Sequence, residues 1–200
     1  MTESGKPGNI PHEFEVRRLT PADRDRALES VEAGLREQAR YAEDEGFFER
    51  SLHQQAASLE NDPEQWWVAV TDDAVVGVMR LRPQEDQYGE YVTIRELDVA
   101  AEYRRRGVGT RLAQHAIDVV APMDATRLFV NSFVFNPGLN LFRRMGFVDL
   151  RLEMRNDKNR NRTVLWRSVR NPQQPWVPGR PGTMTPPRQD ERGRFIWDDP

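Results

Sequence analysis

The sequence predicts an α/β domain built around a mixed sheet. Strand-like and helix-like stretches follow one another in the order strand, two helices, three strands, helix, strand, helix, two strands. Strands that are joined directly form antiparallel hairpins, whereas a helix between two strands produces a parallel crossover. With 200 residues, of which 38% are hydrophobic, the chain can bury one core and needs no second domain.

The first strand and two helices are predicted from local patterns between Phe14 and Leu59. Apolar residues alternate roughly in FEVRRLT, as in a strand. In the following TPAD, Thr20 is an N-cap, Pro21 occupies the first helical position and Asp23 completes a capping box. Helical spacing then continues with a break at the acidic AEDEG, so we expect two helices joined by a short acidic loop.

The remaining elements are predicted in the same way. In WWVAVTDDAVVGVMRLRP, Asp72 and Asp73 mark a hairpin turn, and YVTIRELDV is the next strand. A helix is expected from about Gly107 to Val120, and TRLFVNSFVF is the strand after it. PGLNLFRRMGF predicts a short helix from about Pro137 that ends with Gly146 at C′. FVDLRLEMR and TVLWRSV are the last two strands.

Composition divides the chain into three parts. Residues 1–11 are polar and read as a loose leader, and residues 12–170 form the predicted domain. Residues 171–200 are rich in Pro, Gly and Arg and cannot build a core of their own. Two alternatives stay open for this tail: it is disordered, or Trp176 and the FIW of residues 195–197 pack on the domain or on a second copy of it.

Composition also excludes several classes of function. The formal net charge of -3 argues against nucleic acid and anionic membranes as partners. The absence of cysteine excludes disulfides, thiolate zinc sites and cysteine nucleophiles. We expect no metal site, because His12, His53 and His115 are far apart and match no ligand spacing. The chain shows no apolar leader and no run of about 20 apolar residues, so we expect a cytoplasmic protein.

The stretch EYRRRGVGTRL is the clearest candidate binding site. Arg104, Arg105 and Arg106 precede Gly107-Val108-Gly109 at the start of a predicted helix. Unpaired N–H groups and the helix dipole favour an anion there, and glycine allows close approach. Leu112 stands where a dinucleotide-binding motif needs its third glycine, and the Gly-Lys-Ser/Thr of a P-loop is absent. The alternative is a glycine turn with merely solvated arginines.

This pattern resembles the acyl-CoA pyrophosphate loop of the GNAT superfamily of N-acyltransferases. Arg104, Gly107 and Gly109 match its Arg/Gln-x-x-Gly-x-Gly/Ala signature between a strand and a helix. EVRRLTPADRDRAL, WVAVTDDAVVGVMRL and NPGLNLFRRMGF also fall in the family's order, over about residues 14–169. The resemblance implies a GNAT-like mixed, mostly antiparallel sheet flanked by helices, with a splayed central strand pair, and acetyl-CoA as co-substrate.

The resemblance also implies where CoA binds. The pyrophosphate is expected on the N–H groups from about Arg106 to Thr110, with added charge from the preceding arginines. The pantetheine arm is expected beside Leu97 and Val99, whose backbone groups would pair with it like an added strand and donate to the oxyanion. Asn136 resembles the asparagine that contacts this arm, and a turn or helix-cap role is the equal alternative.

Acyl transfer to an amine requires a base for the ammonium proton and donors for the developing oxyanion. If Leu97 and Val99 face the core, Glu96 and Asp98 face the opposite side of the strand. We predict that Glu96 is the base, directly or through water, with Asp98 as the second candidate. The alternative is that Glu96 forms an ion pair with an arginine such as Arg95 or Arg80.

One position departs from the family pattern. Phe142 stands where relatives usually carry the tyrosine that protonates the departing sulfur, and phenylalanine has no proton to give. Thiolate is nevertheless a tolerable leaving group, because thiol pKa values lie near 8.5. Tyr88, Tyr91 and Ser132 are candidate replacements from neighbouring strands.

The acceptor site is expected at the two early helices, around Glu37 and residues 41–45, and at the last hairpin. This acidic rim would favour a cationic amine or a basic peptide N-terminus; the alternative is a solvated loop. The resemblance therefore implies an N-acetyltransferase that acts on an amine of a small molecule or peptide by direct attack in a ternary complex, as a monomer or homodimer. The rivals are a catalytically weak acyl-CoA-binding regulatory module and another acyl-CoA enzyme on the same fold, such as a decarboxylase.

Overall fold

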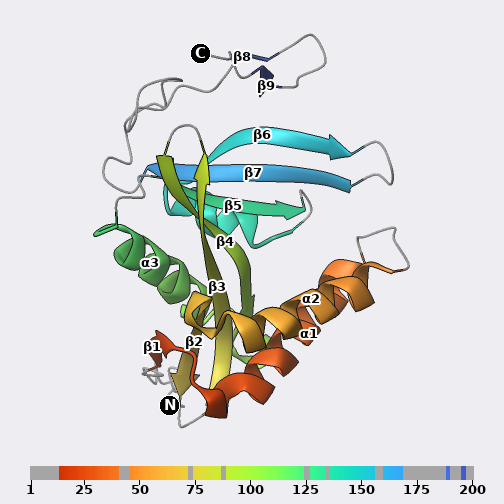
Figure 1. Cartoon of the computed structure of the whole chain (residues 1–200), viewed down its shortest axis with the longest axis vertical. Coiled ribbons are helices and arrows are strands. Elements are labelled where there is room, and N and C mark those ends of the chain that lie inside the picture. The colour runs from red at the N-terminus through yellow and green to blue at the C-terminus, as the bar shows by residue number, and fades with distance from the viewer. Residues whose placement is uncertain are drawn as a thin grey trace, which may run out of the picture.

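The computed structural model of the chain describes residues 14–40, 46–71, 74–86, 89–123, 127–133, 136–155 and 160–168, and the tail pairs 188–189 and 195–196. The main strands are β1 (Glu15–Arg18), β2 (Trp66–Thr71), β3 (Ala74–Asp86), β4 (Gly89–Val99), β5 (Arg127–Phe133), β6 (Val148–Arg155) and β7 (Arg160–Ser168). The α-helices are α1 (Arg24–Ala39), α2 (Phe47–Asn61), α3 (Val108–Val120) and α4 (Leu139–Arg144). Their order along the chain is the predicted one (Figure 1).

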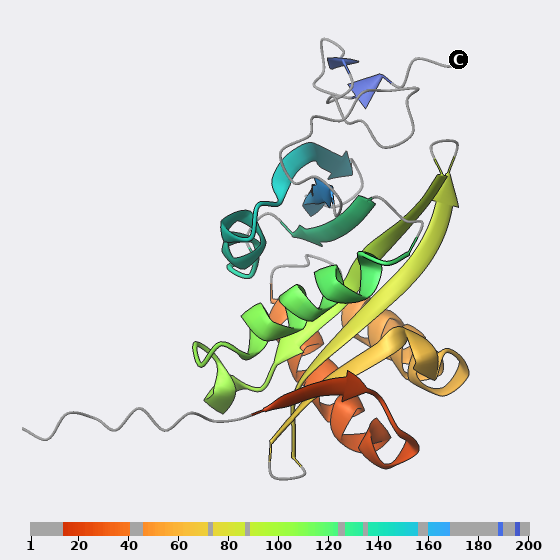
Figure 2. The same cartoon turned by 90° about the vertical axis from the view of Figure 1, so that its left-hand side faces the viewer.

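The strands form a seven-stranded sheet in the order β1-β2-β3-β4-β5-β7-β6. Neighbouring strands are antiparallel except β4 and β5, which helix α3 joins and which run parallel. Pairing between these two runs only from Tyr91↔Arg127 to Ile94↔Val130, although both strands continue beyond it. Figure 2 shows β5, β6 and β7 turned away from the long strands β3 and β4. The mixed, mostly antiparallel sheet with a splayed central pair is thereby confirmed.

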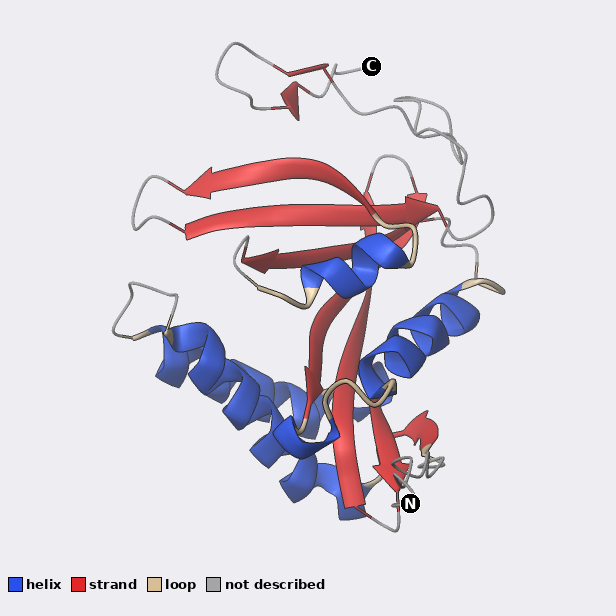
Figure 3. Cartoon of the chain, turned by 180° about the vertical axis from the view of Figure 1, so that it is seen from behind, coloured by secondary structure: helices blue, strands red, loops and turns tan. Residues whose placement is uncertain are grey.

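Helices cover both faces of the sheet. Helices α1 and α2 contribute Val31, Leu35 and Leu59 to an apolar cluster on one face, together with Trp66 of β2. Helices α3 and α4 contribute to a second cluster on the other face, where α4 lies against β5 and β7 (Figure 3). Gly77 of β3 lets α3 approach, because a Cβ there would lie 3.0 Å from Val108 and 3.1 Å from Leu112.

The predicted helix boundaries are confirmed at two places. The Thr20 N–H donates to Asp23 Oδ2 at 2.8 Å, ahead of α1. Arg17, which donates to the same carboxylate at 2.6 Å, holds the pKa of Asp23 far below its ordinary value. Gly146 follows α4 with a φ of 84°, the left-handed conformation expected of a glycine at C′.

In the tail, the two-residue strands β8 (Arg188–Gln189) and β9 (Phe195–Ile196) pair antiparallel. Trp176 and Trp197 lie outside the described residues, so the predicted docking of these aromatic residues stays a prediction, as do the boundaries at residues 12 and 170. No described helix combines the length and apolar character needed to cross a membrane.

Candidate active site

The end of β4 presents backbone groups that the sheet does not use. The Ala100 N–H donates to the Val76 carbonyl of β3 at 3.0 Å. Because hydrogen-bonding direction alternates along an antiparallel strand, Leu97 and Val99 direct their N–H and C=O groups away from β3, toward the gap left by β5. This is the side on which the pantetheine arm and the oxyanion are expected.

The glycine turn lies at the same end of the sheet. Gly107 is the N-cap of α3 with a φ of 90°, which favours glycine, and Arg105 has a φ of 60°. The Arg111 N–H donates to the Gly107 carbonyl at 2.9 Å, so the N–H groups of Val108–Thr110 precede the first intrahelical bond. A Cβ on Gly109 would lie 3.6 Å from Val99 and 3.7 Å from Leu97, which places the turn beside the gap.

The arginines of this loop have different surroundings. Arg104 donates from Nε to the Val99 carbonyl at 3.0 Å and from Nη2 to Glu37 Oε2 at 2.7 Å. The Arg106 guanidinium lies over the Tyr103 ring, 5.5 Å from its centroid, and Arg105 is exposed. Arg104 therefore ties the loop to β4 and α1. Glu37, which was expected at the rim of the acceptor site, pairs with this arginine.

A cavity of about 160 Å³ opens at the gap. Its walls come from α1, α2, β4, β5 and the start of α4. Among the lining residues are Gln38, Phe47, Ser51, Gln54, Gln55, Arg95, Glu96, Leu97, Asn131, Ser132, Asn136 and Phe142. The predicted residues Glu96, Leu97, Asn136 and Phe142 thus meet at one place. Asp98 and Glu37 are not among the lining residues, and residues 41–45 lie outside the described part of the chain.

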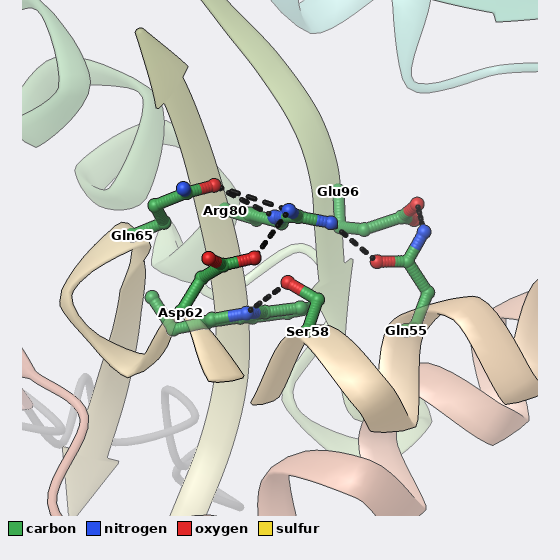
Figure 4. Close-up of polar contacts among 7 residues, drawn as sticks. Gln55, Ser58, Asp62, Gln65, Arg80 and Glu96 are labelled. Atoms are coloured by element: carbon green, nitrogen blue, oxygen red, sulfur yellow. Dashed lines mark hydrogen bonds and ion pairs between the residues drawn. The ribbon is translucent and has the colours of Figure 1, made fainter. Parts of the chain in front are cut away.

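Glu96 is held by a side chain of α2. Gln55 donates from Nε2 to Glu96 Oε1 at 2.7 Å and accepts at Oε1 from Arg80 Nη1 at 3.3 Å (Figure 4). Arg80, the arginine expected as an alternative partner for Glu96, is thus linked to it through an amide. Both Gln55, with 4% exposure, and Arg80, with 8%, are buried.

Asp98 lies on the same face of β4 but under α1. Its carboxyl group occupies the space where a side chain on Gly34 would lie. Oδ2 is buried and has no hydrogen-bond partner among the described residues. Burial raises the pKa of Asp98 to about 7; Arg104 opposes this shift, and Glu37 adds to it.

The other predicted site residues either line the cavity or make contacts within the fold. Asn136 donates to Ser132 Oγ at 2.8 Å and accepts from the Gly138 N–H at 2.8 Å, so it caps a turn and also lines the cavity. Phe142 packs edge-to-face on Phe147, with ring centroids 5.3 Å apart. Of the candidate acids, Ser132 lines the cavity, Tyr91 packs on Phe129 and Tyr88 lies outside the described residues.

Sequence reasoning missed Gln55 as part of the site, and it considered Arg80 only as an ion-pair partner. Both residues are polar at positions where the sequence pattern predicts an apolar side chain. Gln55 comes three residues after Leu52 and four before Leu59, on the apolar stripe of α2. Arg80 is a charge inside the otherwise apolar run VVGVMRL. A polar side chain at a core position requires a polar partner.

The comparisons with known proteins agree with this geometry. A family model described as "Acetyltransferase (GNAT) family" matches residues 28–147, more than half of the chain. The chain belongs to the GNAT acetyltransferase family. A curated family relative from Xenopus tropicalis, named "Probable N-acetyltransferase camello", is 28% identical over 120 residues, which cover 57% of this chain and 54% of that protein. The chain therefore spans about half the length of this curated relative.

Solved GNAT structures share the fold. The PaiA N-acetyltransferase of Thermoplasma acidophilum, solved in complex with coenzyme A, superposes with a TM-score of 0.63 at 14% identity and covers 78% of this chain and 99% of its own. The NatC complex bound to Gag peptide and CoA contains a chain that superposes with a TM-score of 0.60 at 21% identity. The match covers 77% of this chain and 97% of that chain. At these identities the likeness shows the fold alone.

Proposed function

We propose that the chain is an N-acetyltransferase that moves an acetyl group from acetyl-CoA to an amine of a small molecule or peptide by direct attack in a ternary complex. The observation that carries the proposal is the cavity at the β4–β5 gap. Its walls combine Glu96, Leu97 and residues of the helices α1 and α2 at one opening. Direct attack needs donor, amine and base at one place, without a covalent enzyme intermediate.

Each part of the site has one role in this reaction. The loop from Arg104 to Thr110 binds the CoA pyrophosphate through backbone N–H groups and the charge of its arginines. The gap side of Leu97 and Val99 takes the pantetheine arm and supplies the oxyanion donor, and Asn136 contacts that arm from the cavity wall. Glu96 takes the ammonium proton. Asp98 is the weaker candidate because its carboxyl group is buried under Gly34.

The acceptor is proposed to enter between α1 and α2. Four of the α1 and α2 residues that line the cavity are polar and uncharged, namely Gln38, Ser51, Gln54 and Gln55, and the other two, Leu35 and Phe47, are apolar. Such a wall suits the amide groups of a peptide as well as a small amine, and the NatC structure was solved with a peptide. A monomer or homodimer in the cytoplasm remains part of the proposal, tested by light scattering and cell fractionation.

A thiol-release assay tests the proposed reaction. Purified protein is incubated with acetyl-CoA and pools of amines and peptides, and free CoA is followed with a thiol reagent. The chain contains no cysteine, so the protein adds no background. Amine-dependent thiol release is expected. CoA binding without release for any amine would favour an acyl-CoA-binding regulatory module, and carbon dioxide release from a carboxyacyl-CoA would favour a decarboxylase.

The CoA-binding loop is tested by calorimetry with CoA. Arg105→Ala combined with Arg106→Ala is expected to weaken CoA binding by about 1.5–3 kcal/mol, the range for charged hydrogen bonds. Arg104 is left in place because it holds Val99 and Glu37. Arg82→Ala, which removes an exposed arginine of β3, is the matched control. Equal affinities for the three proteins would contradict the site assignment.

A further inference from the structure

We propose that Gln55 is a positioning residue for the Glu96 carboxylate and that Arg80 fixes the amide orientation in which Gln55 acts. The inference rests on the proposed function, in which Glu96 takes the proton of the acceptor amine. It adds one side chain from α2 and one from β3 to the machinery of the cavity. Figure 4 shows the Gln55 amide between the Arg80 guanidinium and Glu96.

The orientation of the Gln55 amide follows from the chemistry of its neighbours. A guanidinium has only donors, so the group that meets Arg80 Nη1 at 3.3 Å must be the Gln55 carbonyl oxygen. The amide nitrogen is thereby directed to Glu96 Oε1, at 2.7 Å. Gln55 therefore acts as a donor to Glu96, and this donor favours the ionised carboxylate over the protonated acid.

Arg80 is itself fixed on several sides. Gln65 Oε1 accepts from Arg80 Nε at 3.2 Å and from Nη2 at 3.1 Å. Asp62 Oδ2 lies 3.4 Å from Nη2. The guanidinium also lies over the Trp66 ring, 5.8 Å from its centroid. A guanidinium held this way cannot rotate to release the Gln55 carbonyl without losing these contacts.

A further hydrogen bond, between β2 and α2, fixes the position of α2 on the sheet near Gln55. The Trp66 indole N–H donates to Ser58 Oγ at 3.1 Å, inside the core. Ser58 follows Gln55 by three residues, so the two side chains lie on the same face of the helix. The position of Gln55 over Glu96 is thus set by the packing of α2 on β2 and β3, before any substrate arrives.

The charges around Glu96 explain what the arrangement does. The charged groups that act on Arg80 include Asp62, Arg82 of β3, Arg95 of β4 and Glu96 itself. Asp98 lies two residues from Glu96 on β4. The α1, α2 and β5 residues that line the cavity are uncharged. The Gln55 amide bonds to both groups, so the positive charge of Arg80 polarises the amide that donates to Glu96. The bond from Gln55 directs one oxygen of Glu96 toward α2, and a donor at this place favours the form of the carboxyl group that accepts a proton.

Two substitutions of Gln55 test the inference through the pH dependence of turnover. Gln55→Leu removes the donor, and Gln55→Glu keeps an acceptor for Arg80 but replaces the donor with a like charge beside Glu96. We expect kcat at pH 7 to fall about tenfold, with CoA affinity within twofold, and the acidic limb of the pH–rate profile to move up by about one pH unit, further for Gln55→Glu. Gln55→Met serves if Gln55→Leu does not fold.

Gln114→Leu is the matched control. Gln114 donates to Asp118 Oδ1 at 2.9 Å on α3, the same kind of bond outside the cavity. Its pH profile is expected to match that of the wild type. If folded Gln55 variants keep the wild-type kcat and acidic limb, the positioning role is overturned; a purely structural role lowers the melting temperature but does not move the limb.

A second measurement separates this inference from the proposed function. The Glu96 carboxyl is titrated by carbon-13 NMR in the wild type and in the Gln55 variants, which requires no turnover. A midpoint that moves to higher pH in both variants supports the role of Gln55, and an unchanged midpoint refutes it. Absence of thiol release by the wild type with every amine refutes the proposed function instead.

Discussion

Glu96 and Asp98 stand two residues apart on the same face of β4, and their surroundings differ. Glu96 lines the cavity and accepts a hydrogen bond from Gln55. Asp98 is covered by α1 at Gly34, with one oxygen buried and unpartnered within the described part of the chain. A charge supported by a donor is available for chemistry, whereas a carboxyl group without one is driven toward its neutral form. Strand position alone therefore does not decide which carboxylate acts.

The largest expected effect is on turnover, and it compares the two carboxylates directly. Glu96→Gln is expected to lower kcat by roughly 10²–10⁴-fold, the range for loss of a general base, with CoA affinity retained. Asp98→Asn is expected to stay within a few-fold of the wild type. Steady-state kinetics with the amine that gives the fastest thiol release measure kcat for the wild type and both variants. A large loss in Asp98→Asn with little loss in Glu96→Gln would reverse the assignment.

The next effect is on the pH dependence of stability. Burial raises the pKa of Asp98 from 3.8 to about 7, so between these pH values the folded state binds more protons than the unfolded state. The Asp98 contribution to the free energy of unfolding is therefore lost as pH rises from about 4 to about 7.

Asp98→Asn should abolish that pH dependence. Its free energy of unfolding at pH 8 is expected to exceed that of the wild type by roughly 2–4 kcal/mol, with the two proteins similar at pH 4. Urea denaturation at both pH values measures this difference. Parallel stability curves would show that Asp98 is not responsible.

A third effect concerns the contact between Asp98 and α1. Gly34→Ala places a methyl group where the Asp98 carboxyl lies, and is expected to cost about 1–3 kcal/mol of stability, as overpacking does. In an Asp98→Ala background the same change should be neutral or stabilising, because alanine favours a helix over glycine. A double-mutant cycle isolates the coupling, and additive effects would contradict the contact.

The smallest effect is on departure of the thiolate, on the β5 and α4 side of the cavity. Ser132→Ala is expected to lower kcat a few-fold if its hydroxyl protonates the leaving sulfur. Adding Phe142→Tyr to the Ser132→Ala variant should restore that loss, because it supplies a phenol from the cavity wall. The wild type, the two single variants and the double variant are compared by single-turnover kinetics. A large loss in Phe142→Tyr alone would indicate that Phe142 packs against substrate instead.

The order of elements was predictable because apolar periodicity and turn residues are local properties. The facing of Glu96 and Asp98 was also predictable from alternation, although β4 carries an irregularity at Arg95, where Arg80 pairs with Glu96 and Leu81 with Ile94. The splay of β4 and β5 came from the family resemblance, because no local pattern states where pairing between two distant strands stops.

The surroundings of each side chain were less accessible. Gln55 and Arg80 are separated by 25 residues, and their contact depends on how α2 packs on β3. Glu37 was assigned to an acidic rim by composition, yet its partner Arg104 is 67 residues away. Charge runs show which charges are present, whereas tertiary packing decides which of them meet.

If CoA binds in the gap as proposed, the short ladder between β4 and β5 makes the sheet responsive to that ligand. Four register pairs join the two halves of the sheet there, supplemented by Arg127, which donates to Asp86 at 2.8 Å and to the Gly89 carbonyl at 2.7 Å. A molecule bound in the gap contacts both halves of the sheet, so its binding free energy stabilises their association. Amide hydrogen exchange in β5 and β7 should then slow when CoA is bound, more than in β2, so that the acyl donor acts as a removable cross-link of the sheet.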